Sequence, residues 1–216
     1  MQADPAALDE LKRLGVPRVP AVAVGDRAVH GWNPQGYAAL LGVGYATPTR
    51  LAPRELAARL DVILASVQAL VARLDATQMA WEPPERKRTL RDLSYHAFRL
   101  SLAFIDAMDL GALPEGWLQE KAPGEFHDGG DVARYGALVR GRIQGWFAGA
   151  ADEEFDRTLD VYYGPQSGHE LLERTTWHAG QHLRQLYELA HRLGVTPPAP
   201  LPAEALKGLP LPESLW

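Results

Sequence analysis

The chain has 216 residues, of which 46% are hydrophobic and 23% charged, so it can bury a core as an ordinary globular protein does. It contains no cysteine, which excludes disulfide bonds, thiolate metal ligands and a cysteine nucleophile, and any thiol chemistry must use a thiol from outside the protein. The formal net charge is −5 and the basic residues are scattered, which argues against a nucleic-acid-binding surface. No stretch approaches the roughly 18 consecutive apolar residues of a membrane span, and the N-terminal sequence is unlike a signal peptide. We therefore expect a cytoplasmic protein with neither nucleic acid nor membrane as a partner.

Residues 1–44 predict a small α-β-β-α segment. Residues 5–14 have the pattern of a short helix, and the residues after it alternate as a two-stranded hairpin with its turn at Gly25-Asp26. "NPQGYAALLG" then predicts a second helix, with Asn33 as its N-cap and Gly42 as its stop.

Residues 45–52 have the glycine, proline and threonine content of a linker, and the pattern after them changes to long helices. Four such helices are expected, over residues 53–75, 89–109, 131–150 and 168–193. The last has a capping box, with Ser167 followed three residues later by Glu170. The fold class is therefore mainly α, with a four-helix bundle over residues 53–196. Residues 197–216 form a proline-rich tail that we expect to be extended along the bundle.

Three histidines occupy positions on helices where a buried apolar stripe is expected. His178 and His182 lie four residues apart on the fourth helix, and His96 lies in the matching stripe of the second. Residues at i and i+4 are about 5 to 6 Å apart at Cβ, close enough for two imidazoles to bind one metal ion. Any one of them alone is explained as a hydrogen-bonded core histidine, but three converging imidazoles are unfavourable without a partner. The spacing thus leaves two interpretations open, a metal site with an open fourth position or satisfied core histidines.

The remaining polar residues near these histidines give no further site. Ala179 stands where a zinc protease of the HExxH type has its glutamate, so that class is excluded. Gln181 and Glu173 are each explained as a group supporting the ligands or as a solvent-facing helix residue, and we favour the second interpretation. We expect the other four histidines at the surface: His30, His127, His169 and His191.

With these residues, "DLSYHAFRL" and "WHAGQH" resemble the DinB/YfiT-like family of four-helix bundles, over about residues 50–195. In that family one histidine of the second helix and a His-x-x-x-His pair of the fourth hold a metal. The resemblance therefore implies His96, His178 and His182 as ligands. It also implies a homodimer and an enzyme that uses a low-molecular-weight thiol, as the mycothiol-dependent isomerases and bacillithiol transferases do.

The front segment resembles the C-terminal half of a glutaredoxin. That resemblance makes Val19-Pro20 the cis pair before a strand, with Gly31, Trp32 and Asn33 after the hairpin. The first strand, the helix after it and the active-site cysteines of a glutaredoxin are all absent, which argues against redox activity. In glutaredoxins this half contacts the backbone of the thiol cofactor, so the resemblance implies that Val19 and Pro20 are candidates for such a contact. The alternative is a relic that covers the bundle or builds a dimer interface.

Together these observations predict a metal-dependent thiol S-transferase in which zinc or nickel activates an external thiol toward a small-molecule electrophile. No further catalytic residue is assigned. A metal-dependent hydrolase is the closest alternative, and a non-catalytic metal- or ligand-binding stress-response protein is a second one.

Overall fold

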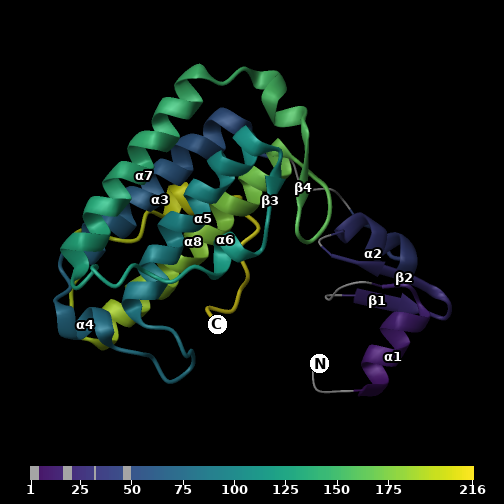
Figure 1. The fold of residues 1–216 in the computed structure, drawn as a ribbon, viewed down its shortest axis with the longest axis horizontal. Helices are drawn as coiled ribbons and strands as arrows, with labels where there is room; N and C mark the ends of the chain where they lie inside the picture. Colours follow the sequence, from purple (N-terminus) through teal and green to yellow (C-terminus); the bar gives the residue numbers. More distant parts are fainter. Residues whose placement is uncertain (1–4, 17–20, 32, 46–49) are drawn as a thin grey trace. The chain divides into compact units, whose positions relative to one another are not determined.

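The computed structural model describes residues 5–16, 21–31, 33–45 and 50–216 (Figure 1). The chain divides into two compact units. The first comprises Met1–Arg50 and Tyr162–Pro165, and the second comprises Leu51–Val161 and Gln166–Trp216. Among the described residues, no helix combines the length and apolar character that a membrane span needs.

The first unit has the expected α-β-β-α order, with α1 (Pro5–Arg13), β1 (Ala21–Val24), β2 (Arg27–His30) and α2 (Pro34–Leu41). The two strands are antiparallel, and the turn between them is Gly25-Asp26, where Gly25 adopts a φ of 59° that favours glycine. The Asn33 side chain caps α2 by accepting from Gly36 N, and Gly42 ends it in the left-handed conformation, which confirms both predicted boundaries. Val19, Pro20 and Trp32 lie outside the described residues, so the glutaredoxin resemblance stays a prediction.

The second unit is a four-helix bundle, as predicted, built from α3 (Pro53–Val71), α5 (Leu90–Leu110), α7 (Gly129–Gly149) and α8 (Gly168–Arg192). Helix α8 packs along both α3 and α5, and α7 packs along the same two helices from the other side (Figure 1). Helices that follow each other along the chain, α3 and α5 or α7 and α8, therefore occupy diagonal corners. This arrangement places α5 directly beside α8.

Local capping fixes the ends of these helices. Ser167 and Glu170 form the predicted capping box at the start of α8, with Ser167 Oγ accepting from Glu170 N at 3.2 Å. The first helix is shorter than the prediction of residues 53–75, because Asp75 caps a separate short helix, α4 (Ala76–Ala80). Helix α7 starts before residue 131, because Asp128 is its N-cap.

The bundle core is apolar and tightly packed. The predicted face of α3 is buried along its length: Leu56, Leu60, Ile63, Val67 and Leu70. Helices α5 and α7 approach closely at Gly136, where a Cβ would lie 2.4 to 2.8 Å from ring atoms of Phe98.

Several short elements had no clear sequence signal. Strand β3 (Ala112–Leu113) pairs in parallel with β4 (Thr158–Val161), which pairs antiparallel with β5 (Gln166–Ser167). The other short elements are α6 (Gly116–Gln119), the 3-10 helix η1 (Asp152–Asp156) and α9 (Ala203–Leu206). Helix α9 corrects the expectation of a fully extended tail, since Leu206 and Leu209 bury their side chains against the bundle.

Candidate metal centre

The three predicted histidines meet between α5 and α8. His96 comes from α5, and His178 and His182 lie one turn apart on the face of α8 that packs against it. One ring nitrogen from each histidine can be chosen so that all three lie within 4.8 Å of one another. The ring centroid of His96 lies 5.6 Å from that of His178 and 5.0 Å from that of His182. The centroids of His178 and His182 are 4.6 Å apart. The helix arrangement thus brings together the residues that the spacing and the resemblance had singled out.

Two of the imidazoles are buried with a polar atom left unpaired. His96 is 6% exposed and His182 3%, while His178 is half-buried. His96 Nδ1 and His182 Nε2 have no hydrogen-bond partner among the described residues. A buried nitrogen without a partner costs roughly 1 to 3 kcal/mol, and a metal ion would remove that cost. Neutral imidazoles are the donors that zinc and nickel accept, so the side chains fit such an ion.

The second nitrogen of His182 has a partner. His182 Nδ1 lies 2.9 Å from Gln185 Oε1 of the next turn. An amide oxygen accepts hydrogen bonds and never donates them, so Nδ1 carries the proton and Nε2 keeps its lone pair. Histidine ligands of metals are held by hydrogen bonds of this kind.

All three imidazoles are held in the neutral form that binds metals. Burial, followed by the charges of His182 and Arg88, lowers the pKa of His96 to about 2. Burial lowers the pKa of His182 to about 4, against the opposing hydrogen bond from Gln185. The pKa of His178 is also well below its ordinary value, through burial and then the charges of the other two histidines. No proton has to leave before a metal binds at neutral pH.

The protein supplies three candidate ligands and no fourth one among the described residues. Within the described residues the cluster contains three imidazoles, with no carboxylate and no fourth histidine. Three protein ligands and an open position are typical of catalytic zinc sites, whereas structural sites are closed by four.

Sequence reasoning missed two arginines beside the centre. Arg86 and Arg88 lie in the loop before α5, and their positive charges lower the pKa of both His96 and His182. The neighbouring Glu85 holds this loop against α8 through Arg192, at 2.6 Å. Neither arginine side chain has a hydrogen bond or salt bridge to another residue of the described ranges. The two arginines therefore place positive charge near the three histidines.

The expectation that Gln181 faces solvent is wrong. Its side chain is 7% exposed instead of solvent-facing, because Nε2 donates to the carbonyl oxygens of Ser214 and Leu215 in the tail. Glu173 is half-buried, and no hydrogen bond connects it to the histidines.

The other four histidines lie outside the centre. His30, His127 and His191 are exposed, as expected. His169 is half-buried at the start of α8, where Nε2 lies 2.8 Å from Leu51 O.

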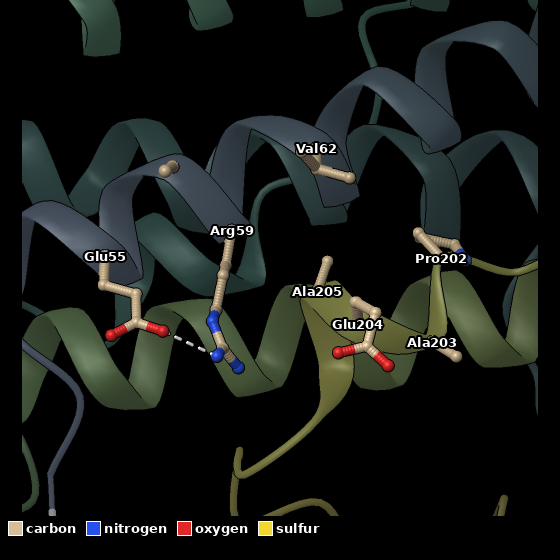
Figure 2. A pocket seen from close by; sticks show the side chains of 8 residues that line it. Glu55, Arg59, Val62, Pro202, Ala203, Glu204 and Ala205 are labelled. Atoms are coloured by element: carbon tan, nitrogen blue, oxygen red, sulfur yellow. Dashed lines mark hydrogen bonds and ion pairs between the residues drawn. The ribbon is translucent and has the colours of Figure 1, made fainter.

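A separate pocket of about 480 Å³ lies between α3 and α9 (Figure 2). Its charged lining is already paired, since Arg59 donates to Glu55 at 2.7 Å and Lys207 lies 3.8 Å from Glu204. None of the three clustered histidines lines it. This pocket therefore has no set of groups that suggests chemistry.

A family model of the DinB superfamily matches residues 23–186. The match covers most of the chain and includes all three clustered histidines, so the chain belongs to the DinB superfamily. No curated protein matches the sequence.

Two solved structures from Bacillus subtilis have the same fold. A DinB-like protein is 17% identical with a TM-score of 0.54, over 65% of this chain and 93% of its own. The protein YfiT is 15% identical with a TM-score of 0.53, over 71% of this chain and 96% of its own. YfiT is described as a probable metal-dependent hydrolase with an unusual four-helix bundle topology.

Proposed function

We propose that His96, His178 and His182 bind one zinc or nickel ion, and that the protein is a metal-dependent thiol S-transferase. The observation that carries the metal site is the pair of buried, unpaired ring nitrogens within a cluster of three neutral imidazoles. When bound, the ion supplies a positively charged coordination position that lowers the pKa of a thiol or water placed there.

Two features support a thiol as the nucleophile. The described part of the cluster has no carboxylate to act as a general base, and a thiol needs less help than water to lose its proton because its pKa is near 8.5. Arg86 and Arg88 add positive charge that favours an anionic thiol. Since the chain has no cysteine, that thiol must be a separate small molecule.

The proposed reaction is a substitution on a small electrophile. The thiol sulfur forms a bond to an electrophilic carbon, the leaving group departs with the bonding electron pair, and the thiol proton passes to solvent. The residues of the chain bind and orient the reactants, and no oxidant or reductant is required.

The metal site is tested first by elemental analysis of the purified protein. Because the three histidines form a single site, we expect about one transition metal ion per chain. A His178→Ala, His182→Ala variant should lose that ion. Absence of metal in both proteins, even after incubation with zinc or nickel, would mean that the imidazoles are core residues.

The reaction is tested with metal-loaded protein, a chromogenic aryl halide and a panel of thiols that includes mycothiol, bacillithiol and glutathione. Turnover should require both the thiol and the metal, and it should be lost in His178→Ala. Unchanged turnover in that variant would show that the chemistry occurs elsewhere.

A metal-dependent hydrolase is the second candidate, because YfiT is described as one. The same protein preparation distinguishes the two with a nitrophenyl ester offered without any thiol. Metal-dependent ester cleavage that added thiol does not accelerate would favour the hydrolase. Metal binding without either activity would favour a non-catalytic binding protein.

A further inference from the structure

The end of the tail crosses α8 beside the metal centre. Arg184 donates to Pro212 O at 2.8 Å, and Gln181 Nε2 donates to Leu215 O at 2.8 Å. Gln185 Nε2 donates to the same Leu215 oxygen at 2.7 Å. Farther along, Arg192 lies over the ring of Trp216 at 5.7 Å. The backbone of the tail is thus tied to successive turns of the helix that carries two of the three histidines.

The Leu215 carbonyl determines which way the Gln185 amide points. A backbone carbonyl accepts hydrogen bonds and cannot donate them, so the group of Gln185 that faces it must be the NH₂. The amide oxygen then faces the opposite way, toward His182 Nδ1 at 2.9 Å. Gln185 is 3% exposed, so water does not compete for these bonds.

The same reasoning extends to the imidazole. Because the Gln185 oxygen can only accept, His182 must carry its proton on Nδ1. The lone pair is then on Nε2, which is the buried nitrogen without a hydrogen-bond partner. The chain of hydrogen bonds therefore runs from the tail carbonyl through Gln185 to His182 Nδ1, and it leaves the lone pair on the opposite ring nitrogen, Nε2.

We propose that Gln185 is a positioning residue for the metal centre and that the Leu215 carbonyl of the tail sets its orientation, so that the tail prepares His182 to bind metal. The part of this proposal that concerns metal affinity rests on the proposed function, whereas the part that concerns the tautomer of His182 does not.

Gln181 provides a matched control on the same helix. It donates to the same tail carbonyl, but its amide oxygen accepts from Arg184 at 2.9 Å and bonds to no histidine. A Gln181→Leu variant therefore loses a contact with the tail while the hydrogen bond between Gln185 and His182 remains.

The experiment compares the native protein with Gln185→Leu, Gln185→Glu, Gln181→Leu and a chain that ends at Glu213. The tautomer of His182 is read from ¹⁵N shifts of histidine-labelled, metal-free protein, and zinc affinity from competition with a chromophoric chelator. Circular dichroism and the Tm establish that each variant is folded.

In the native protein His182 should carry its proton on Nδ1. Gln185→Leu and the shortened chain should give a mixture of tautomers and bind zinc about 10- to 100-fold more weakly, the usual effect of losing a group that holds a metal ligand. Gln185→Glu should keep the Nδ1 proton, because a carboxylate also accepts, and Gln181→Leu should match the native protein in both readouts.

A Gln185→Leu protein that keeps the Nδ1 tautomer and native zinc affinity would overturn the proposal, and so would a shortened chain that behaves as native. If the native protein binds no zinc but the tautomer responds as expected, the metal assignment fails while the positioning by the tail stands. If zinc binds tightly in every variant, the metal assignment stands and the positioning is refuted.

Discussion

Acid should destabilise the metal-free protein through its clustered histidines. The pKa of an imidazole in an unfolded chain is about 6.5, whereas burial lowers the pKa of His96 to about 2 and that of His182 to about 4 in the fold. Because each folded pKa lies below the unfolded one, the unfolded state binds more protons once the pH falls below 6.5. Their contribution to stability is therefore complete above that pH and is lost as the pH falls, down to about 4 for His182 and about 2 for His96.

The magnitude follows from the distance between the working pH and the unfolded pKa. At pH 5 an unfolded imidazole is about 1.5 pH units below its pKa, and one unit corresponds to about 1.36 kcal/mol, so each histidine removes about 2 kcal/mol. His96 and His182 together remove about 4 kcal/mol relative to pH 7, and His178 acts in the same direction. This is a large part of the roughly 5 to 15 kcal/mol by which domains are stable.

Urea unfolding in the presence of a chelator measures this effect, with circular dichroism as the signal at pH 7 and pH 5. A His96→Gln, His182→Gln variant is the comparison, since it shares every other titratable group, and His178 keeps the burial that is the largest cause of its lowered pKa. The variant should lose about 4 kcal/mol less between the two pH values than the native protein does. An equal loss in both proteins would refute the reasoning, because the two imidazoles would then not be buried in the neutral form.

Three further predictions concern the metal and the bundle. Zinc at 100 times its dissociation constant should stabilise the protein by about 2.7 kcal/mol, measured as a rise in Tm that a chelator reverses; a Tm indifferent to zinc would contradict a site specific to the folded state. Gly136→Ala should destabilise the bundle by roughly 1 to 3 kcal/mol in urea unfolding, because its Cβ would meet the Phe98 ring, while Gly141→Ala on the same helix, with no atom within 4 Å, should be neutral or stabilising. Arg99→Met should cost about 1.5 to 3 kcal/mol in the same assay, because Glu120 loses a hydrogen-bond donor at 2.6 Å; an unchanged stability would show that water replaces the arginine.

The long helices were predictable because the signals that define them are local. A capping residue and the apolar period of a helix lie within a few residues of each other, as at Ser167 and Glu170. The errors occurred where a second local signal competed with the first. Asp75 was assigned to the end of α3, but it caps α4 through Gln78.

The pairing of the short strands could not be predicted in the same way. Strand β3 and strand β4 are only a few residues long, and they are brought together across α7. A strand of two residues has no alternating pattern to detect, and its partner is determined by how the bundle packs.

In the candidate site, too, the features with a local sequence signal were predictable and those set by tertiary structure were not. The i and i+4 spacing of His178 and His182 was visible in the sequence, and the position of His96 in a matching stripe suggested that it would meet them. Gln185 gave no such signal, because its role depends on a carbonyl at Leu215 that reaches it through tertiary structure. Gln181 was misjudged for the same reason, since nothing in its neighbourhood along the helix predicts that the tail will cover it.

The diagonal arrangement of consecutive helices has a consequence for biosynthesis. During translation α3, α5 and α7 leave the ribosome before α8. His96 on α5 is therefore synthesised well before His178 and His182, the two histidines of α8 that it meets in the fold. Until α8 inserts between α3 and α5, both of those helices expose the apolar faces that it will cover. A nascent chain at that stage exposes these faces to chaperones and to aggregation, and its three clustered histidines are not yet together. Synthesis of the last long helix therefore closes the core and brings the three histidines together in a single event.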